Sequence, residues 1–395
     1  MINQQLTEVT TIHTMLPNYW PHFIASPYAY YNHESIYLYH HPQFNGQEVI
    51  LPWNNQFTGC TSIIFENEAT AIVDINILNK EEVYATLIHE LFHCHQYHKK
   101  ETRFPNELTG MAYPLERENI QWRIQEREWL NQALRMKDIN KQREAIQAFI
   151  YWREKREEQY NEFVQYENLI ETIEGPAFFI EYHAYKDIVN QPDERVLERY
   201  LKSLTDYSIM TNKIRHSCYP SGLAICLLLE TFSPKWKEEL FDHQLTLYEV
   251  LKQEFESLAK APKRMHLAYS LDNLIHEAEI SKEREISHFK ETNGLLFTLI
   301  GQGKIQQFDP MNIIKLHKNF LHKNGMTIRL QEQSIYFSKP VLALTENGLS
   351  DVTQLQFFID HPPEQTIDGI SIDGIGHFLG ELKQIGDNFQ FILSK

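Results

Sequence analysis

The sequence is poor in cysteine, has no excess of basic residues and contains no apolar stretch long enough to cross a membrane. Its 4 cysteines lack C-x-x-C spacing and the density of a disulfide scaffold. The longest strongly apolar run, 223–229, is far too short for a bilayer. Residues 1–20 contain neither a basic region nor a continuous apolar segment, so they do not predict a secretory signal. We therefore expect a cytoplasmic protein.

The charge balance limits the kinds of partner. Acidic residues (53) outnumber Lys and Arg (37), which gives a formal charge of -16 at pH 7. A nucleic-acid backbone or an anionic membrane surface would repel such a chain at long range. We expect a peptide or small-molecule substrate, no nucleic acid and no membrane. The composition predicts no oligomeric state.

The 395 residues suffice for more than one packed unit, and a 42% hydrophobic content predicts a real core. The sequence texture changes twice along the chain. Residues 1–80 are an expected N-terminal β-rich part of a catalytic domain, 81–288 a mainly helical catalytic region, and 289–395 a C-terminal β-rich domain. The predicted class is therefore α+β. Expected strands are 62–65, 71–77, 295–300, 326–330, 341–344 and 389–392.

The segment 81–96 contains an H-E-x-x-H motif. Its apolar residues have helical spacing, and acidic residues occupy its first turn. On a helix, His89 and His93 project from one face and can bind one Zn²⁺. Glu90 lies beside the first of them, where a carboxylate can take a proton from a metal-activated water. The motif therefore predicts a zinc site.

A third ligand must come from elsewhere in the chain. The H-E-x-x-H-x-x-G-x-x-H arrangement requires glycine and histidine where the sequence has Gln96 and Lys99. His95 and His98 point away from the ligand face and are expected to be packing or surface residues. A carboxylate on a second helix is the alternative, and the segment 174–181, E-G-P-A-F-F-I-E, offers one.

This second segment carries a family resemblance. Its E-G-x-A-x-aromatic-x-E pattern is similar to the third-ligand helix of gluzincins, which include the zinc aminopeptidases and leukotriene hydrolase. The resemblance implies a zincin-like catalytic domain in which Glu174 is the third ligand and Glu181 orients a ligand histidine. The segment beginning at Tyr219 resembles the family's Y-x-x-G helix start, whose tyrosine donates a hydrogen bond to the oxyanion.

The sequence departs from the aminopeptidase pattern in the interval 94–173. In those enzymes the glutamate follows a short loop, and here that position would be Ala112, which cannot bind zinc. The interval instead contains charged helices that must leave the site and return. Pro176 either begins a helix near the ligand or kinks one. Rival ligands are Glu171, Glu116 and Glu118.

Two further features have open interpretations. His216 competes with Tyr219 as oxyanion donor, because other gluzincins use a histidine. Glu66 and Asn67 echo the Glu-Asn pair that binds the substrate amine in aminopeptidases, but a turn between 64 and 71 is the preferred interpretation. The strand 71–77 is expected at a sheet edge, where it can pair with an extended peptide.

These observations predict a zinc-dependent hydrolase, specifically a metallopeptidase. His89, His93 and Glu174 are the expected metal ligands, Glu90 the expected general base and Tyr219 the expected oxyanion donor. One alternative is a non-catalytic zincin-like binding protein, although Glu90 would then serve no purpose. The other is a zinc hydrolase of non-peptide bonds.

Overall fold

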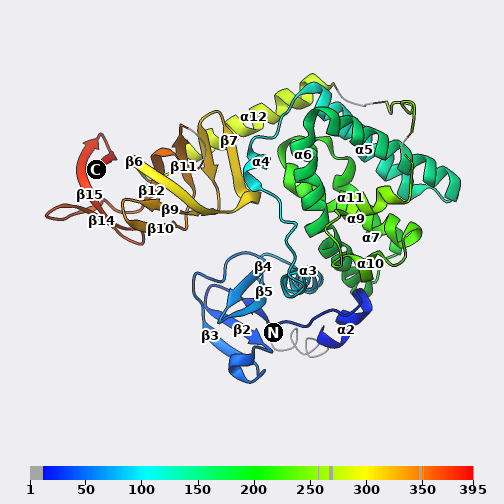
Figure 1. The fold of residues 1–395 in the computed structure, drawn as a ribbon. Coiled ribbons are helices and arrows are strands. Elements are labelled where there is room, and N and C mark those ends of the chain that lie inside the picture. The colour runs from blue at the N-terminus through cyan, green and yellow to red at the C-terminus, as the bar shows by residue number, and fades with distance from the viewer. Residues whose placement is uncertain (1–11, 257, 267–269, 347–348, 350, 395) are drawn as a thin grey trace. The chain divides into compact units, whose positions relative to one another are not determined.

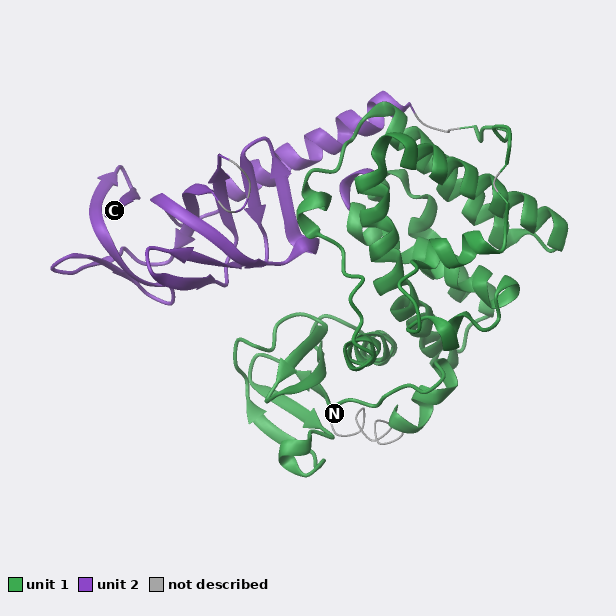
Figure 2. Cartoon of the chain, in the orientation of Figure 1, with its two compact units in different colours: residues 1–210, 214–268 green, residues 211–213, 269–395 purple. Residues whose placement is uncertain are grey.

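The computed structural model describes residues 12–256, 258–266, 270–346, 349 and 351–394. It forms two compact units, one of residues 1–210 and 214–268 and the other of 211–213 and 269–395 (Figure 2). The predicted α+β class is confirmed, with an N-terminal sheet, a helical region and a C-terminal sheet. The first unit holds both the N-terminal sheet and most helices. Helix α12 (Leu271–Lys290) belongs to the second unit, whereas most of its residues fall in the helical region 81–288 expected from the sequence.

In the described residues, the N-terminal sheet has the strand order β3-β2-β1-β5-β4. Strand β5 pairs in parallel with β1 and antiparallel with β4. The expectation that 71–77 forms a sheet edge is therefore wrong, and the edges of the described sheet are β3 and β4. The nearly continuous burial of β5 is typical of an interior strand. The strands are β1 Tyr28–Tyr31, β2 Ser35–Tyr39, β3 Val49–Pro52, β4 Thr61–Phe65 and β5 Glu68–Asp74.

The expected turn between β4 and β5 is confirmed. Glu66 and Asn67 have φ values of 45° and 68°, and these two residues connect the paired strand ends. A two-residue hairpin turn of this kind needs positive φ at both central positions. Glu66 is exposed there.

Helix α3 (Lys80–His98) carries the H-E-x-x-H motif and lies in contact with β5 and α6. Its start is fixed by a capping box, in which the Asn79 side chain accepts from the Glu82 amide and the Glu82 carboxylate accepts from the Asn79 amide. Leu87, Ile88 and Leu91 are fully buried. The cap and the apolar face together set which side of α3 faces the helical region.

The other helices of the first unit pack mainly against one another, and α6 is the one with the most contacts to α3 (Figure 1). They are α2 Ile12–Tyr19, α4 Glu107–Met111, α5 Arg117–Arg135, α6 Ile139–Ile188, α7 Asp193–Leu201, α8 Tyr207–Asn212, α9 Ile214–Phe232, α10 Trp236–Glu239 and α11 Leu247–Gln253. Helix α8 extends into residues that group with the second unit. None of the helices in the described part of the chain combines the length and apolarity that a membrane span needs.

Pro176 and Pro220 both lie inside helices. Helix α6 passes through Pro176 with helical backbone angles, and its one non-helical residue is Tyr160 (φ -127°, ψ 33°). Helix α9 begins at Ile214, so Tyr219 lies within the helix rather than at its start. Proline is favoured in the first turn of a helix, so Pro220 suggests a helix start in the sequence. In the structure, however, α9 already has a full turn before Pro220.

Fully buried ion pairs hold α5, both halves of α6 and α9 together. Glu167 accepts from Arg123 Nε at 2.8 Å and from Arg156, and Glu171 accepts from Arg153 at 2.5 Å. Glu171 also accepts from the Ser221 hydroxyl on α9. Every one of these charged side chains is at most 1% exposed. The network therefore holds residues 167–171 of α6, just before Glu174, against α5, α9 and the first half of α6.

We expect Glu167→Gln to lower the free energy of unfolding by about 3–5 kcal/mol, because Arg123 and Arg156 would be left buried without their charged partner. Urea denaturation followed by circular dichroism measures it. Glu158→Gln is the matched control, since the exposed Glu158 pairs with Lys155 at the surface and should matter little. Equal effects of the two substitutions would contradict the prediction.

Acid should weaken the same network. Burial alone would raise the pKa of Glu167, but the charges of Arg123 and Arg156 lower it well below its ordinary value. A carboxylate with a lowered folded pKa adds stability above its unfolded pKa, and that stability is lost as the pH falls through the folded pKa. The difference between wild type and Glu167→Gln should therefore shrink in acid.

The second unit is a β structure preceded by α12. The strand order is β13-β14-β15-β16-β6-β12-β11-β8-β7, with β9 pairing to β6 and β10 pairing to β9. All four strands expected here are present. The bounds are β6 Leu295–Phe308, β7 Ile313–Leu316, β8 Asn319–His322, β9 Met326–Leu330, β10 Gln333–Phe337, β11 Val341–Thr345, β12 Val352–Ile359, β13 Glu364–Gln365, β14 Gly369–Ile372, β15 Gly376–Ile385 and β16 Asn388–Leu393.

Candidate metal centre

Two helices bring three potential ligands together inside the first unit. His89 and His93 come from α3, and Glu174 comes from the second half of α6. One ligand atom from each of the three lies within 4.8 Å of the others. His89 and Glu174 are buried, and His93 is half-buried. The three residues form a candidate metal-binding group.

The distances within this group suit a small tetrahedral ion. His89 Nε2 and His93 Nε2 are 3.1 Å apart, and Glu174 Oε2 lies 3.4 Å and 3.2 Å from them. Nitrogen and oxygen ligands at about 2.0–2.1 Å from Zn²⁺ in tetrahedral directions would stand about 3.4 Å apart. The buried Oε2 atom of Glu174 has no hydrogen-bond partner among the described residues. The donor set and its spacing therefore fit zinc.

The outer nitrogen of each histidine has its own acceptor. Glu181 Oε2 lies 2.8 Å from His89 Nδ1, and Gln96 Oε1 lies 2.8 Å from His93 Nδ1. The Gln96 amide nitrogen donates to the Ile173 carbonyl at 2.8 Å, which fixes the amide orientation. Such acceptors hold the proton on Nδ1 and leave Nε2 free to bind a metal.

The electrostatic environment favours a positive charge. Burial alone would lower the pKa of His89, but the neighbouring Glu174 and Glu181 carboxylates raise it well above its usual value. Burial would raise the pKa of Glu174, but the positive charge of the adjacent His93, together with His89, lowers it well below the usual value. The negative electrostatic potential that favours a proton on the histidines also attracts a metal cation. The proton and the metal compete for the same ligand atoms.

Helices α6 and α9 approach at two glycines beside Glu174. A Cβ added to Gly175 would lie 2.8 Å from Gly222 Cα, and one added to Gly222 would lie 2.6 Å from Gly175 Cα. Any side chain at either position would force the helices apart. The close approach brings Arg215 and Tyr219 of α9 to the metal group.

Glu90 and Tyr219 lie near the three candidate ligands. Burial raises the pKa of Glu90, and the charges of His89 and His93 oppose this shift. The Tyr219 ring stacks on His89 with centroids 6.2 Å apart and planes 9° apart. Burial and the negative charge of Glu174 raise the phenol pKa well above its usual range, so Tyr219 carries its proton. His216 is exposed, and its ring centroid lies 5.5 Å from that of Tyr219.

The rival ligands lie elsewhere. Glu171 is paired with Arg153, while Glu116 and Glu118 are exposed around the start of α5. His95 is buried in an aromatic cluster and accepts from the Ile24 amide, and His98 contacts the Ser26 hydroxyl. None of these five side chains belongs to the candidate metal-binding group.

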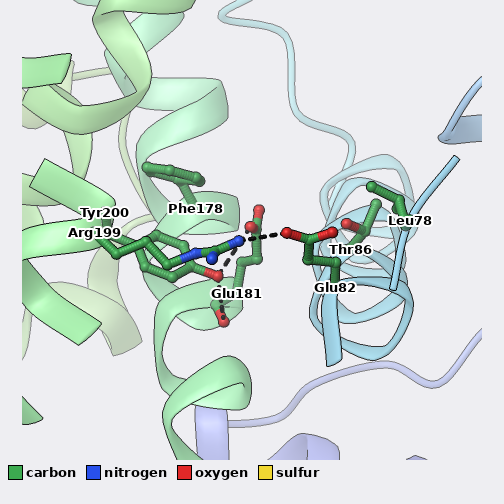
Figure 3. A pocket seen from close by; sticks show the side chains of 7 residues that line it. All are labelled: Leu78, Glu82, Thr86, Phe178, Glu181, Arg199 and Tyr200. Atoms are coloured by element: carbon green, nitrogen blue, oxygen red, sulfur yellow. Dashed lines mark hydrogen bonds and ion pairs between the residues drawn. The ribbon is translucent and has the colours of Figure 1, made fainter. Parts of the chain in front are cut away.

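Figure 3 shows the residues that line a cavity of about 250 Å³ between α3, α6 and α7. Its wall includes Glu181, which also contacts His89, and Phe178, whose ring centroid is 6.5 Å from that of His89. Tyr200 donates to Glu181 Oε1 at 3.1 Å, and Arg199 pairs with Glu82 across the cavity. The remaining lining residues are Leu78 and Thr86. The volume is suited to one side chain rather than to a drug-sized molecule.

Sequence reasoning missed three residues of this environment. Gln96 was noted only because it occupies the position where the H-E-x-x-H-x-x-G-x-x-H motif requires glycine. Its spacing of three residues from His93 nevertheless places both side chains on one helical face. Tyr200 and Arg215 lie in segments without a motif, so no local signal could have identified them.

Comparisons with protein-family models, curated proteins and solved structures found no match.

Proposed function

We propose that this chain is a zinc-dependent metallopeptidase of the gluzincin kind, resembling the zinc aminopeptidases and leukotriene hydrolase in its motifs. The observation that carries the proposal is the convergence of His89 Nε2, His93 Nε2 and Glu174 Oε2, with an orienting acceptor behind each histidine. A purely structural site usually has four protein ligands, whereas three leave a position open for substrate.

The side chains around this group can divide the work of amide hydrolysis. When bound, zinc would act as a Lewis acid toward the scissile carbonyl and make water a better nucleophile. Glu90 would accept a proton from that water and later deliver it to the leaving nitrogen. The Tyr219 hydroxyl would donate a hydrogen bond to the carbonyl oxygen as negative charge develops on it.

Two surfaces near the centre suit an extended peptide. Strand β4 pairs on one side only among the described strands, and an extended chain can add to such an edge through backbone hydrogen bonds. The cavity lined by Phe178 and Glu181 would receive one substrate side chain. The same centre could act on a non-peptide bond, and the substrate assay below separates this alternative from peptide hydrolysis.

We expect the purified protein to bind about one zinc per chain, because three ligand atoms converge on one point. His89→Ala and Glu174→Ala should lose most of the metal, measured by elemental analysis after gel filtration. His98→Ala is the control on the same helix, since His98 lies outside the metal group. Full zinc occupancy in both ligand variants would overturn the site.

The activity assay is digestion of a peptide library read by mass spectrometry, with simple esters tested in parallel. Cleavage by wild type that stops on chelation and returns with zinc supports the proposal. A zinc-loaded protein that cleaves only esters points to a hydrolase of non-peptide bonds. A zinc-loaded protein that cleaves neither would overturn the enzymatic proposal and favour a binding role.

A further inference from the structure

Glu174 has a different partner on each carboxylate oxygen. Its Oε2 faces the two histidine nitrogens, while Oε1 accepts a hydrogen bond from Arg215 Nη2 at 2.7 Å. Arg215 comes from the first turn of α9, and its side chain is 16% exposed. A charge-assisted bond of this length is strong and directional, so it limits rotation of the carboxylate.

Arg215 is itself held in place. Its Nη1 lies 3.4 Å from Glu107 Oε1 on α4, and the Tyr166 hydroxyl donates to Glu107 Oε2 at 2.9 Å. The guanidinium thus lies between two carboxylates, with a hydrogen bond to Glu174 inside the metal-binding group and an ion pair without a hydrogen bond to Glu107 outside it. The planar fork of arginine suits this bridging position better than the point charge of lysine.

We propose that Arg215 is a positioning residue of the metal site, which reserves Glu174 Oε1 and leaves Oε2 as the single carboxylate oxygen available to the metal. The inference rests on the proposed zinc site. Glu181 and Gln96 orient the histidines, and Arg215 performs the corresponding task for the third ligand from a helix that supplies no ligand of its own.

Two effects of Arg215 on metal affinity have opposite signs. Its positive charge repels a cation, so removing the charge alone would tighten binding. Its hydrogen bond orders a buried carboxylate, so removing the bond would weaken binding. The Glu107 carboxylate, 3.4 Å from Arg215 Nη1, reduces this repulsion and does not touch the hydrogen bond to Glu174. Ordering therefore dominates, and loss of Arg215 weakens the site.

The test is the zinc dissociation constant, measured by competition with a chromophoric chelator. Arg215→Gln should raise it by about 10–100-fold, the usual effect of losing a residue that orients a metal ligand. Arg215→Lys should recover part of the loss, because an ammonium can still donate to Oε1. Arg199→Gln is the matched control: Arg199 also pairs with a carboxylate near the centre, but its partner Glu82 is outside the metal group.

The visible spectrum of bound Co²⁺ gives a second measurement on the folded protein. Arg215→Gln frees Oε1 to reach the ion, so its spectrum should change while that of Arg199→Gln should match wild type. Wild-type affinity and spectrum in Arg215→Gln would overturn this inference alone, as would equal losses in Arg199→Gln. Failure of wild type to bind either metal would overturn the proposed zinc site as well.

Discussion

Glu90→Gln should lower kcat by at least about a hundredfold while the protein keeps its fold and its zinc. General-base transfer typically contributes 10²–10⁴ to a rate, and a carboxamide cannot accept the proton. The side chain is 7% exposed and close enough to both histidines for their charges to act on its pKa. The substitution nearly preserves volume, so packing should change little.

The control for Glu90→Gln is the same chemical change in the first turn of α3, at Glu81, whose side chain has no place in the metal group. Turnover and zinc content should both be measured on all three proteins. Wild-type turnover in a zinc-loaded Glu90→Gln protein would sink the proposed mechanism. Loss of zinc from that variant would instead give Glu90 a part in metal binding.

Local sequence signals predicted the first half of the metal group well. The spacing of His89 and His93, the acidic first turn and the apolar face all follow from helix geometry, so α3 needed no tertiary information. Four of the C-terminal strands, β6, β9, β11 and β16, were also predicted, because turn signals separate them, whereas the other strands of that unit were not. The turn at Glu66 and Asn67 was also predicted correctly.

Properties that depend on distant neighbours were not predicted. The burial of β5 between two strands depends on β1, which lies far earlier in the chain, so a partly alternating pattern suggested an edge instead. Helix α9 begins at Ile214, before Pro220, and its first residues bond to distant helices, Arg215 to Glu174 of α6 and Ser217 to Arg123 of α5. The family resemblance had placed Tyr219 at the helix start.

The path of the chain from His93 to Glu174 could not be predicted from the sequence for the same reason. Resemblance to a motif identified Glu174, but nothing local showed how an interval of charged helices returns to α3. The answer lies in buried pairs such as Arg153 with Glu171, which join the two halves of α6 across its irregular residue, Tyr160. Several charged residues of this interval, which a sequence pattern alone would place in solvent, therefore lie in the interior of the fold.

Tyr219→Phe should lower kcat by roughly 10²–10³ and leave KM nearly unchanged. The phenyl ring can keep the stacking on His89 and the edge contact with Phe178, so the substitution removes one hydroxyl and little packing. A donor that meets charge only as the oxyanion forms stabilises the transition state and not the bound substrate. Steady-state kinetics with a cleaved library peptide measures both constants.

Tyr97→Phe is the control for this substitution, since Tyr97 is an exposed tyrosine on α3. A rise in KM alone for Tyr219→Phe would mean that the hydroxyl binds the ground state. The exposed His216 supplies the sharper comparison, because it packs against Tyr219 with ring centroids 5.5 Å apart. If Tyr219→Phe is harmless while His216→Ala abolishes turnover in a folded, zinc-loaded protein, the histidine is the oxyanion donor and the resemblance of this segment to the aminopeptidases is misleading.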